Sequence, residues 1–202
     1  MRFLWSKEPL LFIMGWTSYH ADSYKTNGQI DRKKECQKYF LGEFNKGFYR
    51  IEKDTMVGNV YYAAVTALKS YSYDTNSYED IPIEEQDTFA VVILTSVNRK
   101  DYMNFSYKIM DETMGPCEYD CYGLLKYLSP IESEFANKWR EEVKRRHDNQ
   151  TKLKKFPVGT KIKYRDKVLT KTKVYSNKAP LWLTELYTYV PQKKIINFEL
   201  LR

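Results

Sequence analysis

Long apolar segments dominate the first two thirds of the chain and predict a sheet. Residues 89–94 (Phe-Ala-Val-Val-Ile-Leu) are apolar without interruption, which is typical of a strand covered on both faces. We therefore expect the strand at 88–97 to lie at the centre of the sheet. Strand-like segments at 47–56, 58–68 and 102–110 predict further strands.

A helix is predicted to begin after Asp31, whose carboxylate can accept a hydrogen bond in the first turn, and to end near Gly42. Cys36, Tyr39 and Phe40 would share one face of this helix. Cys36 is therefore predicted to be a core residue. Residues 70–87 are polar and acidic, and they predict a loop that is longer than most connections in compact domains.

A second helix is predicted to begin at Ser129, with Pro130 at its first position and Glu132 at its third. Apolar residues recur every fourth position and predict one buried stripe: Ile131, Phe135, Trp139 and Val143. The basic residues 144–147 would end the helix. The polar residues 148–151 would then form a linker.

Lysine and apolar residues alternate at 161–164, which predicts a strand with one solvated face. Short strand-like runs follow at 168–169, 171–175, 181–183, 186–190 and 195–200, and turn residues separate them. Short strands at close spacing favour a small SH3-like β-barrel.

The predicted fold class is α+β, with a mainly antiparallel sheet, a few helices and the C-terminal barrel. The predicted parts are an N-terminal extension at 1–13, an α+β body at 14–128, a linking helix at 129–148 and a basic barrel at 149–202.

Composition narrows the function without naming a reaction. The 202 residues are 43% hydrophobic, which is enough for a core that needs neither disulfides nor metal. A mean hydropathy of -0.63 and the lack of a long apolar run exclude an integral membrane protein. Three Cys and no recognisable secretion signal predict a reducing, intracellular compartment. The motifs of nucleotide hydrolases, serine esterases and zincins are missing from the sequence.

Charge is divided unevenly along the chain. Residues 138–202 contain 18 Lys and Arg against 6 Asp and Glu, whereas residues 1–137 contain 15 against 20. Cations can neutralise phosphates, and aromatic rings can stack on unpaired bases. The predicted nucleic-acid-binding residues are Lys144, Arg145, Arg146, Lys154, Lys155, Lys161, Lys163, Arg165, Lys171, Lys173, Tyr164 and Trp182. Two alternatives stay open: residues 144–147 complement a helix C-terminus, and the strand lysines guard sheet edges.

The segment 111–121 carries four carboxylates and two thiols around a Gly-Pro turn. Carboxylates of this kind can hold Mg²⁺ or Mn²⁺ for phosphodiester hydrolysis, and the candidates are Asp111, Glu112, Glu118 and Asp120. The alternative is an acidic loop before a helix at 122–128, with Asp120 near its positive end. A zinc site would need Cys117, Cys121, His20 and His147. A nucleophilic Cys117 would need His20 as its base. Two buried, unreactive thiols are the simplest explanation.

The acidic residues of the predicted loop support a competing hypothesis. They could imitate a phosphate chain and occupy the nucleic-acid groove of a host enzyme, or they could form a solvated loop without function. These residues are Asp74, Glu79, Asp80, Glu84, Glu85 and Asp87.

Five segments have distinctive sequences: 14–21 (MGWTSYHA), 31–36 (DRKKEC), 89–97 (FAVVILTSV), 101–107 (DYMNFSY) and 110–121 (MDETMGPCEYDC). Together they resemble a family of uncharacterised proteins carried by bacteriophages and integrative elements of bacteria. The resemblance implies a mobile element in the cytoplasm of a bacterial host and an ancestral translation start at Met14, and small proteins in such a setting often counter restriction or CRISPR systems. It implies no activity.

The sequence thus predicts an accessory protein whose basic C-terminal part contacts nucleic acid or a ribonucleoprotein, and it leaves open whether the protein is an enzyme. The competing hypotheses are an inhibitor that binds a host defence protein through the acidic surface, and a metal-dependent nuclease. No cofactor is expected unless the carboxylates of 111–120 bind a divalent metal.

Overall fold

The computed structural model describes residues 17–20, 25–26, 29–98, 102–110, 119–130, 132–173 and 181–201. The predicted N-terminal extension at 1–13 lies outside these residues. The chain forms two compact units, residues 1–139 and 140–202, and the division falls within helix α2 (Glu134–Lys155). Both units are built on antiparallel sheets with few helices, which confirms the α+β class.

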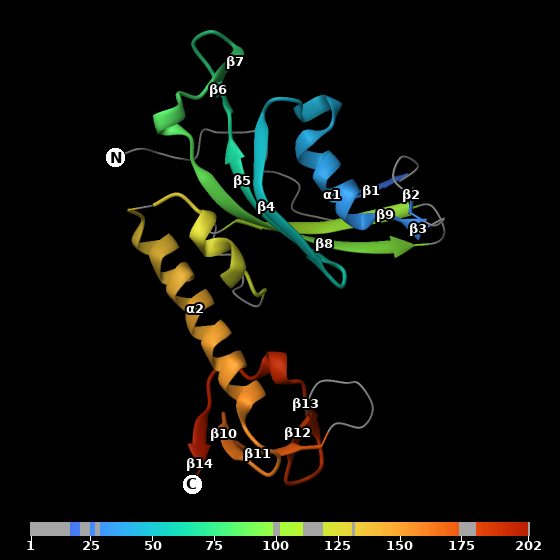
Figure 1. Ribbon diagram of the computed structural model, residues 1–202, viewed down its shortest axis with the longest axis vertical. Helices are drawn as coiled ribbons and strands as arrows, with labels where there is room; N and C mark the ends of the chain where they lie inside the picture. The colour runs from blue at the N-terminus through green and yellow to red at the C-terminus, as the bar shows by residue number, and fades with distance from the viewer. Residues whose placement is uncertain are drawn as a thin grey trace. The chain divides into compact units, whose positions relative to one another are not determined.

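The N-terminal unit contains a five-stranded sheet with the order β1-β9-β8-β5-β4 (Figure 1). Its strands are β1 (Thr17–His20), β4 (Tyr49–Val57), β5 (Val60–Ala67), β8 (Thr88–Asn98) and β9 (Tyr102–Met110). The apolar strand β8 is the middle strand, as its continuous hydrophobic run predicts. A separate two-stranded ribbon pairs β2 (Lys25–Thr26) with β3 (Gln29–Ile30).

Helix α1 (Arg32–Leu41) packs on one face of this sheet (Figure 1). The Asp31 carboxylate accepts a hydrogen bond from the backbone N of Lys34 at 3.1 Å, so Asp31 is the predicted N-cap. Cys36 is fully buried in the core between α1 and the sheet, which confirms its predicted place. Burial raises the pKa of its thiol, so Cys36 is an unreactive core residue.

The opposite face of the sheet is covered by the short 3-10 helix η5 (Tyr122–Tyr127), which contacts β4, β5 and β8. A helix was expected at 122–128, and the structure has a 3-10 helix at this place instead of an α-helix. Leu124 and Cys121 are buried beneath it. With α1 on one face and η5 on the other, β5 is buried along nearly its whole length.

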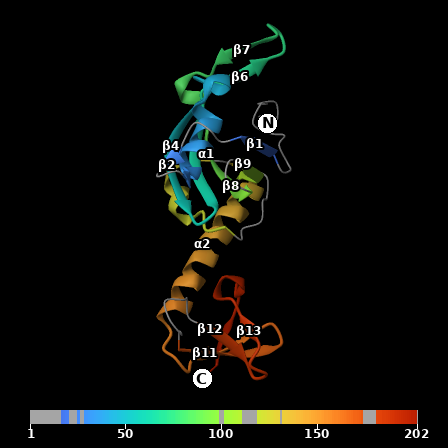
Figure 2. The same ribbon diagram turned by 90° about the vertical axis from the view of Figure 1, so that its right-hand side faces the viewer.

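Residues 69–80 form a β-hairpin, so the prediction of a long loop at 70–87 is wrong. Strands β6 (Lys69–Ser72) and β7 (Ser77–Asp80) pair, and a short 3-10 helix η3 (Ile83–Glu85) follows. Ring contacts connect the hairpin to its own unit: Tyr78 lies 4.7 Å from Phe48 and 5.2 Å from Tyr71 between ring centroids. The hairpin projects beyond the five-stranded sheet in both ribbon views (Figure 2). The polar composition of this segment did not indicate that Tyr71 and Tyr78 pair across the two strands.

Helix α2 begins later and ends later than its sequence predicts. The backbone N of Ala136 donates to the hydroxyl of Ser133 at 3.4 Å, whereas the Ser129 hydroxyl accepts from the backbone N of Thr88 at 2.8 Å. The helix then continues through 148–151, so the predicted linker is helical. Phe135 is 43% exposed, and the buried positions are Ala136, Trp139 and Val143.

None of the helices in the described segments combines the length and apolar composition that crossing a bilayer requires.

The C-terminal unit contains a second five-stranded antiparallel sheet with the order β13-β12-β11-β10-β14. Its strands are β10 (Lys161–Tyr164), β11 (Lys167–Thr172), β12 (Leu181–Thr184), β13 (Tyr189–Val190) and β14 (Glu199–Leu201), and the 3-10 helix η6 (Gln192–Lys194) precedes β14. The run expected at 168–169 and the start of the run expected at 171–175 belong to one strand, β11, which ends at Thr172, and residues 174–175 lie outside the described residues. The pairings among described residues leave this sheet open, with β13 and β14 at its edges.

One face of the C-terminal sheet packs on the last turns of α2. Leu153 of the helix forms a core with Ile162, Leu169, Trp182 and Ile195. Because successive side chains of a strand point to opposite faces, the neighbours of these core residues lie on the other face of the sheet. We call that side the outer face, and it comprises Lys161, Lys163, Val168, Thr170, Leu181, Leu183, Tyr189 and Glu199.

Candidate nucleic-acid interface

The C-terminal unit carries a large excess of positive charge. Residues 140–202 contain 17 Lys and Arg against 6 Asp and Glu, a net charge of +11. Arg145 pairs with Glu142, and the other exposed cations form no ion pair with a residue that the structure describes. The exposed cations are Lys144, Arg145, Lys152, Lys154, Lys155, Lys161, Lys163, Arg165, Lys167, Lys173, Lys193 and Lys194.

Lys171 is buried and has a different role from the one its sequence context predicts. Its side chain is 4% exposed, and its ammonium donates to the backbone carbonyls of Leu153 at 2.8 Å, Lys154 at 2.9 Å and Phe156 at 2.5 Å. The carbonyls at the end of a helix lack partners within the helix, and the positive charge opposes the negative end of its dipole. Burial lowers the pKa of Lys171. The prediction that Lys171 contacts nucleic acid is therefore wrong.

Trp182 is fully buried, so its predicted role in base stacking is wrong as well. Its indole N donates to the Gln192 side chain at 3.4 Å inside the core. Tyr164 is half-buried, and its hydroxyl donates to the Lys194 carbonyl at 2.8 Å. The Arg165 guanidinium lies 5.2 Å from the centre of the Tyr164 ring, which leaves Arg165 exposed beside an aromatic face.

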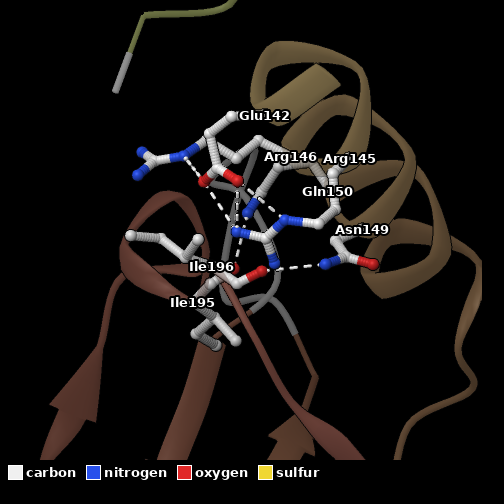
Figure 3. Close-up of polar contacts among 7 residues, drawn as sticks. All are labelled: Glu142, Arg145, Arg146, Asn149, Gln150, Ile195 and Ile196. Carbon is white, nitrogen blue, oxygen red and sulfur yellow. Dashed lines mark hydrogen bonds and ion pairs between the residues drawn. The ribbon is translucent and has the colours of Figure 1, made fainter. Parts of the chain in front are cut away.

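Arg145 and Arg146 bind one carboxylate in the middle of α2 (Figure 3). The Nε of Arg145 donates to Glu142 Oε2 at 2.8 Å, and the Nε of Arg146 donates to Glu142 Oε1 at 2.6 Å. Burial acts to raise the pKa of Glu142, but the hydrogen bonds from the two arginines hold it below its usual value. Because α2 continues to residue 155, the alternative that residues 144–147 complement a helix C-terminus is wrong.

Polar side chains on the next turn of α2 connect the helix to the segment before β14 (Figure 3). Asn149 donates to the Ile196 carbonyl at 2.9 Å, and Gln150 donates to the Ile195 carbonyl at 2.9 Å. These contacts explain why a polar stretch that resembles a linker is helical: its side chains satisfy backbone carbonyls within the unit.

Four exposed lysines gather at one end of the C-terminal sheet, and we call them the lysine end: Lys154, Lys155, Lys161 and Lys173. Helix α2 ends at Lys155, β10 begins at Lys161, and Lys173 follows the end of β11. The backbone N of Lys171 donates to the Thr160 carbonyl at 2.9 Å, which holds the start of β10 beside the end of β11.

The lysine end is poor in negative charge. Residues 149–165 and 167–173 contain no Asp or Glu. Lys163 is left out of the group because Glu199 lies opposite it in the sheet. Since the Lys171 ammonium already satisfies the last carbonyls of α2, the neighbouring Lys154 and Lys155 can remain in solvent.

The candidate metal and thiol sites fall largely outside the described residues. This applies to Asp111, Glu112, Glu118 and Cys117, and also to the side chain of His20. Within the described residues, Asp120 is exposed and accepts from the backbone N of Tyr122 at 3.3 Å, as the alternative of an acidic residue before the helix predicts. Cys121 is a buried free thiol. No group of three or more metal-binding side chains occurs among the described residues.

The acidic residues of the competing hypothesis lie on and after the β6–β7 hairpin. Asp74, Glu79, Asp80, Glu84 and Glu85 are exposed, and Asp87 is half-buried. Two large apolar side chains lie among them, although a polar loop was expected there. Ile83 is 85% exposed and Tyr73 is 71% exposed.

Searches of family models, of curated proteins and of solved structures find no significant match to this chain.

Proposed function

We propose that the C-terminal unit binds nucleic acid through phosphate contacts at the lysine end. The observation that carries this proposal is the set of four exposed lysines without a neighbouring carboxylate in the adjoining sequence. An ammonium group is a compact charge that attracts phosphate without reading a base edge. The binding is therefore expected to be independent of sequence.

Counterion release sets the size of this effect. Each neutralised phosphate of a duplex contributes a slope of about -0.9 to the dependence of log K on log salt concentration. Four contacts would weaken binding by about 10²-fold when salt rises fourfold. A metal ion is not needed for this activity, so binding is expected to be the same in Mg²⁺ and in EDTA, without cleavage.

The resemblance to proteins of phages and integrative elements supports a setting for this activity. We propose an accessory protein in the bacterial cytoplasm that contacts nucleic acid or a ribonucleoprotein, such as a restriction or CRISPR complex. We further propose that the C-terminal sheet is SH3-like. The support is a meander of four strands followed by β14, which returns to pair with the first strand β10.

The proposal is tested by binding of labelled single-stranded and double-stranded DNA and RNA to the full chain. The test variant replaces Lys154, Lys155, Lys161 and Lys173 with Gln. The matched control replaces four exposed lysines of the N-terminal unit, Lys38, Lys46, Lys53 and Lys126. Because both variants lose the same charge, a loss of at least about tenfold in the first and less than about twofold in the second supports the proposal. Equal losses, or no binding by the unaltered protein, contradict it.

The β6–β7 hairpin supports a second candidate, an inhibitor that occupies the nucleic-acid groove of a host defence protein. The supporting observation is that the acidic segment is a hairpin held by aromatic contacts, with Tyr73 and Ile83 exposed among its carboxylates. Such a surface combines negative charge with apolar anchors for a basic partner. The test is protection of duplex DNA from purified restriction endonucleases. Protection that disappears in the D74N/E79Q/D80N variant supports this candidate, and cleavage at the normal rate contradicts it.

A further inference from the structure

The outer face of the C-terminal sheet presents a row of side chains across four strands. Tyr189 lies opposite Leu183, Leu183 opposite Thr170, and Thr170 opposite Lys161. Neighbouring strands are about 4.8 Å apart, so this row spans about 14 Å. Tyr189 is 49% exposed at one edge of the sheet, and Lys161 belongs to the lysine end. The row therefore joins an aromatic ring to the cationic group.

The loop between β12 and β13 carries two prominent apolar side chains. Leu186 is 87% exposed and Tyr187 is 84% exposed. Both were expected within a strand, and no sequence signal marked them. The backbone N of Tyr187 donates to the Thr184 carbonyl at 2.9 Å, and that of Thr184 donates to the Thr188 carbonyl at 3.0 Å. Leu186 and Tyr187 thus form the tip of a closed hairpin.

Tyr187 has a φ of 56°, in the left-handed region, and this position of a three-residue hairpin loop normally holds Gly. A bulky residue there is strained, and strain of this kind is concentrated at functional sites. Tyr187 thus exposes an aromatic ring to solvent at a position whose backbone conformation favours Gly.

The end of the sheet that carries this hairpin tip has no excess of positive charge. The β10–β11 turn lies at the same end, because β12 runs in the same direction as β10. There Arg165 and Lys167 are balanced by Asp166 and Glu185. A nucleic acid bound at the tip would therefore be held by contacts with aromatic rings. At the lysine end, on the opposite side of the sheet's length, it would be held by electrostatic attraction to the ammonium groups.

We propose that the outer face binds single-stranded nucleic acid, with phosphates at the lysine end and unpaired bases stacked on Tyr189 and Tyr187. This inference rests on the proposed function and adds its substrate class. An aromatic side chain can stack only on a base whose face is exposed, and in a duplex the neighbouring base pairs cover these faces, so single strands are preferred. Because every base has such a face, the binding is expected to be independent of sequence. The two apolar side chains of the tip are too few for stable membrane attachment, which needs a larger apolar surface.

The test compares an oligothymidylate of about 12 nucleotides with a duplex of the same length. The variants are Y187A, Y187G and Y189A, with Y73A as the control because Tyr73 is similarly exposed in the other unit. Loss of a stacked ring is expected to weaken single-strand binding about tenfold and to leave duplex binding within about twofold. Y187G is expected to keep or raise the melting temperature, since Gly suits the left-handed position. Loss of binding with that variant would therefore not reflect unfolding.

The remaining outcomes are distinguishable. If the tyrosine variants bind the single strand normally while the lysine-end variant does not, this inference fails and the proposed function stands. If the unaltered protein binds neither nucleic acid, both fail. Two other roles of the tip are tested with the same variant: self-association, measured by sedimentation, and binding to phosphatidylserine vesicles. If Y187G abolishes either property but binds the single strand as well as the unaltered protein does, the inference is overturned.

Discussion

Lys171 places a positive charge inside the C-terminal unit, next to the last turn of α2. Its ammonium donates to three backbone carbonyls at and just after the end of α2, where the carbonyls have no partner within the helix. Sequence alone does not separate it from the lysines around it, because it belongs to the same alternation of polar and apolar positions. The register does separate it: Lys171 follows Leu169 on the core face, whereas Lys161 lies on the outer face.

Replacing Lys171 with Met is expected to lower the free energy of unfolding by about 3 kcal/mol, because buried carbonyls lose their donors. Urea unfolding measures this loss. The control is K173M, which removes an exposed lysine nearby and is expected to change stability by less than about 0.5 kcal/mol. Equal effects of the two substitutions would contradict the assigned role of Lys171.

Glu142 gives the C-terminal unit a defined dependence on pH. Its pKa is lowered in the folded chain, so the carboxylate stabilises the fold above its unfolded pKa, and this contribution is lost as pH falls through the folded pKa. We expect E142Q to be less stable than the unaltered protein at neutral pH and to approach it below about pH 4. Urea midpoints across this range measure the difference, and a constant difference would contradict the ion-pair account.

At the scale of elements, α2 is one continuous helix of 22 residues across the division between the units. Its polar stretch at 148–151 is helical because Asn149 and Gln150 donate to carbonyls near β14, and Leu153 enters the core. Here the tertiary contacts of the unit outweigh the low helix propensity of Asp and Asn.

A proline at Asp148 tests this continuity. If the segment is helical, D148P removes a backbone hydrogen bond and is expected to cost about 3 kcal/mol with a loss of helicity, measured by circular dichroism and thermal unfolding. D148A is the control and is expected to be nearly neutral. A linker would tolerate both substitutions equally, which would contradict the continuous helix.

In the N-terminal unit the continuous apolar runs predicted strands correctly, whereas the polar composition of residues 70–87 did not predict a hairpin. The apolar run of β8 and the Asp31 cap depend on local chemistry, so they predicted the centre of the N-terminal sheet and the start of α1. The β6–β7 hairpin and the middle of α2 depend on distant partners, such as the contact of Tyr78 with Phe48. For the same reason the candidate site was predicted only in part: the lysine end was included, but Lys171 and Trp182 were not recognised as buried, and Tyr187 was missed.

At the scale of the whole molecule, the two units carry opposite charge. Residues 1–139 contain 16 Lys and Arg against 20 Asp and Glu, a net charge of -4, whereas residues 140–202 carry +11. A phosphate chain is repelled by the first unit and attracted by the second. This separation lets one chain present an acidic hairpin and a basic sheet, and it restricts the proposed nucleic-acid contact to the C-terminal unit.

The salt dependence of single-strand binding tests the central claim most directly. The slope of log K against log salt concentration is measured for the unaltered protein, the lysine-end variant and the control variant of the N-terminal unit. If the four lysines neutralise phosphates, the slope of the lysine-end variant is shallower by about 3, at about 0.7 per contact, and the control keeps the original slope. Parallel lines for all three proteins would contradict the account, because the lysine end would then make no phosphate contact.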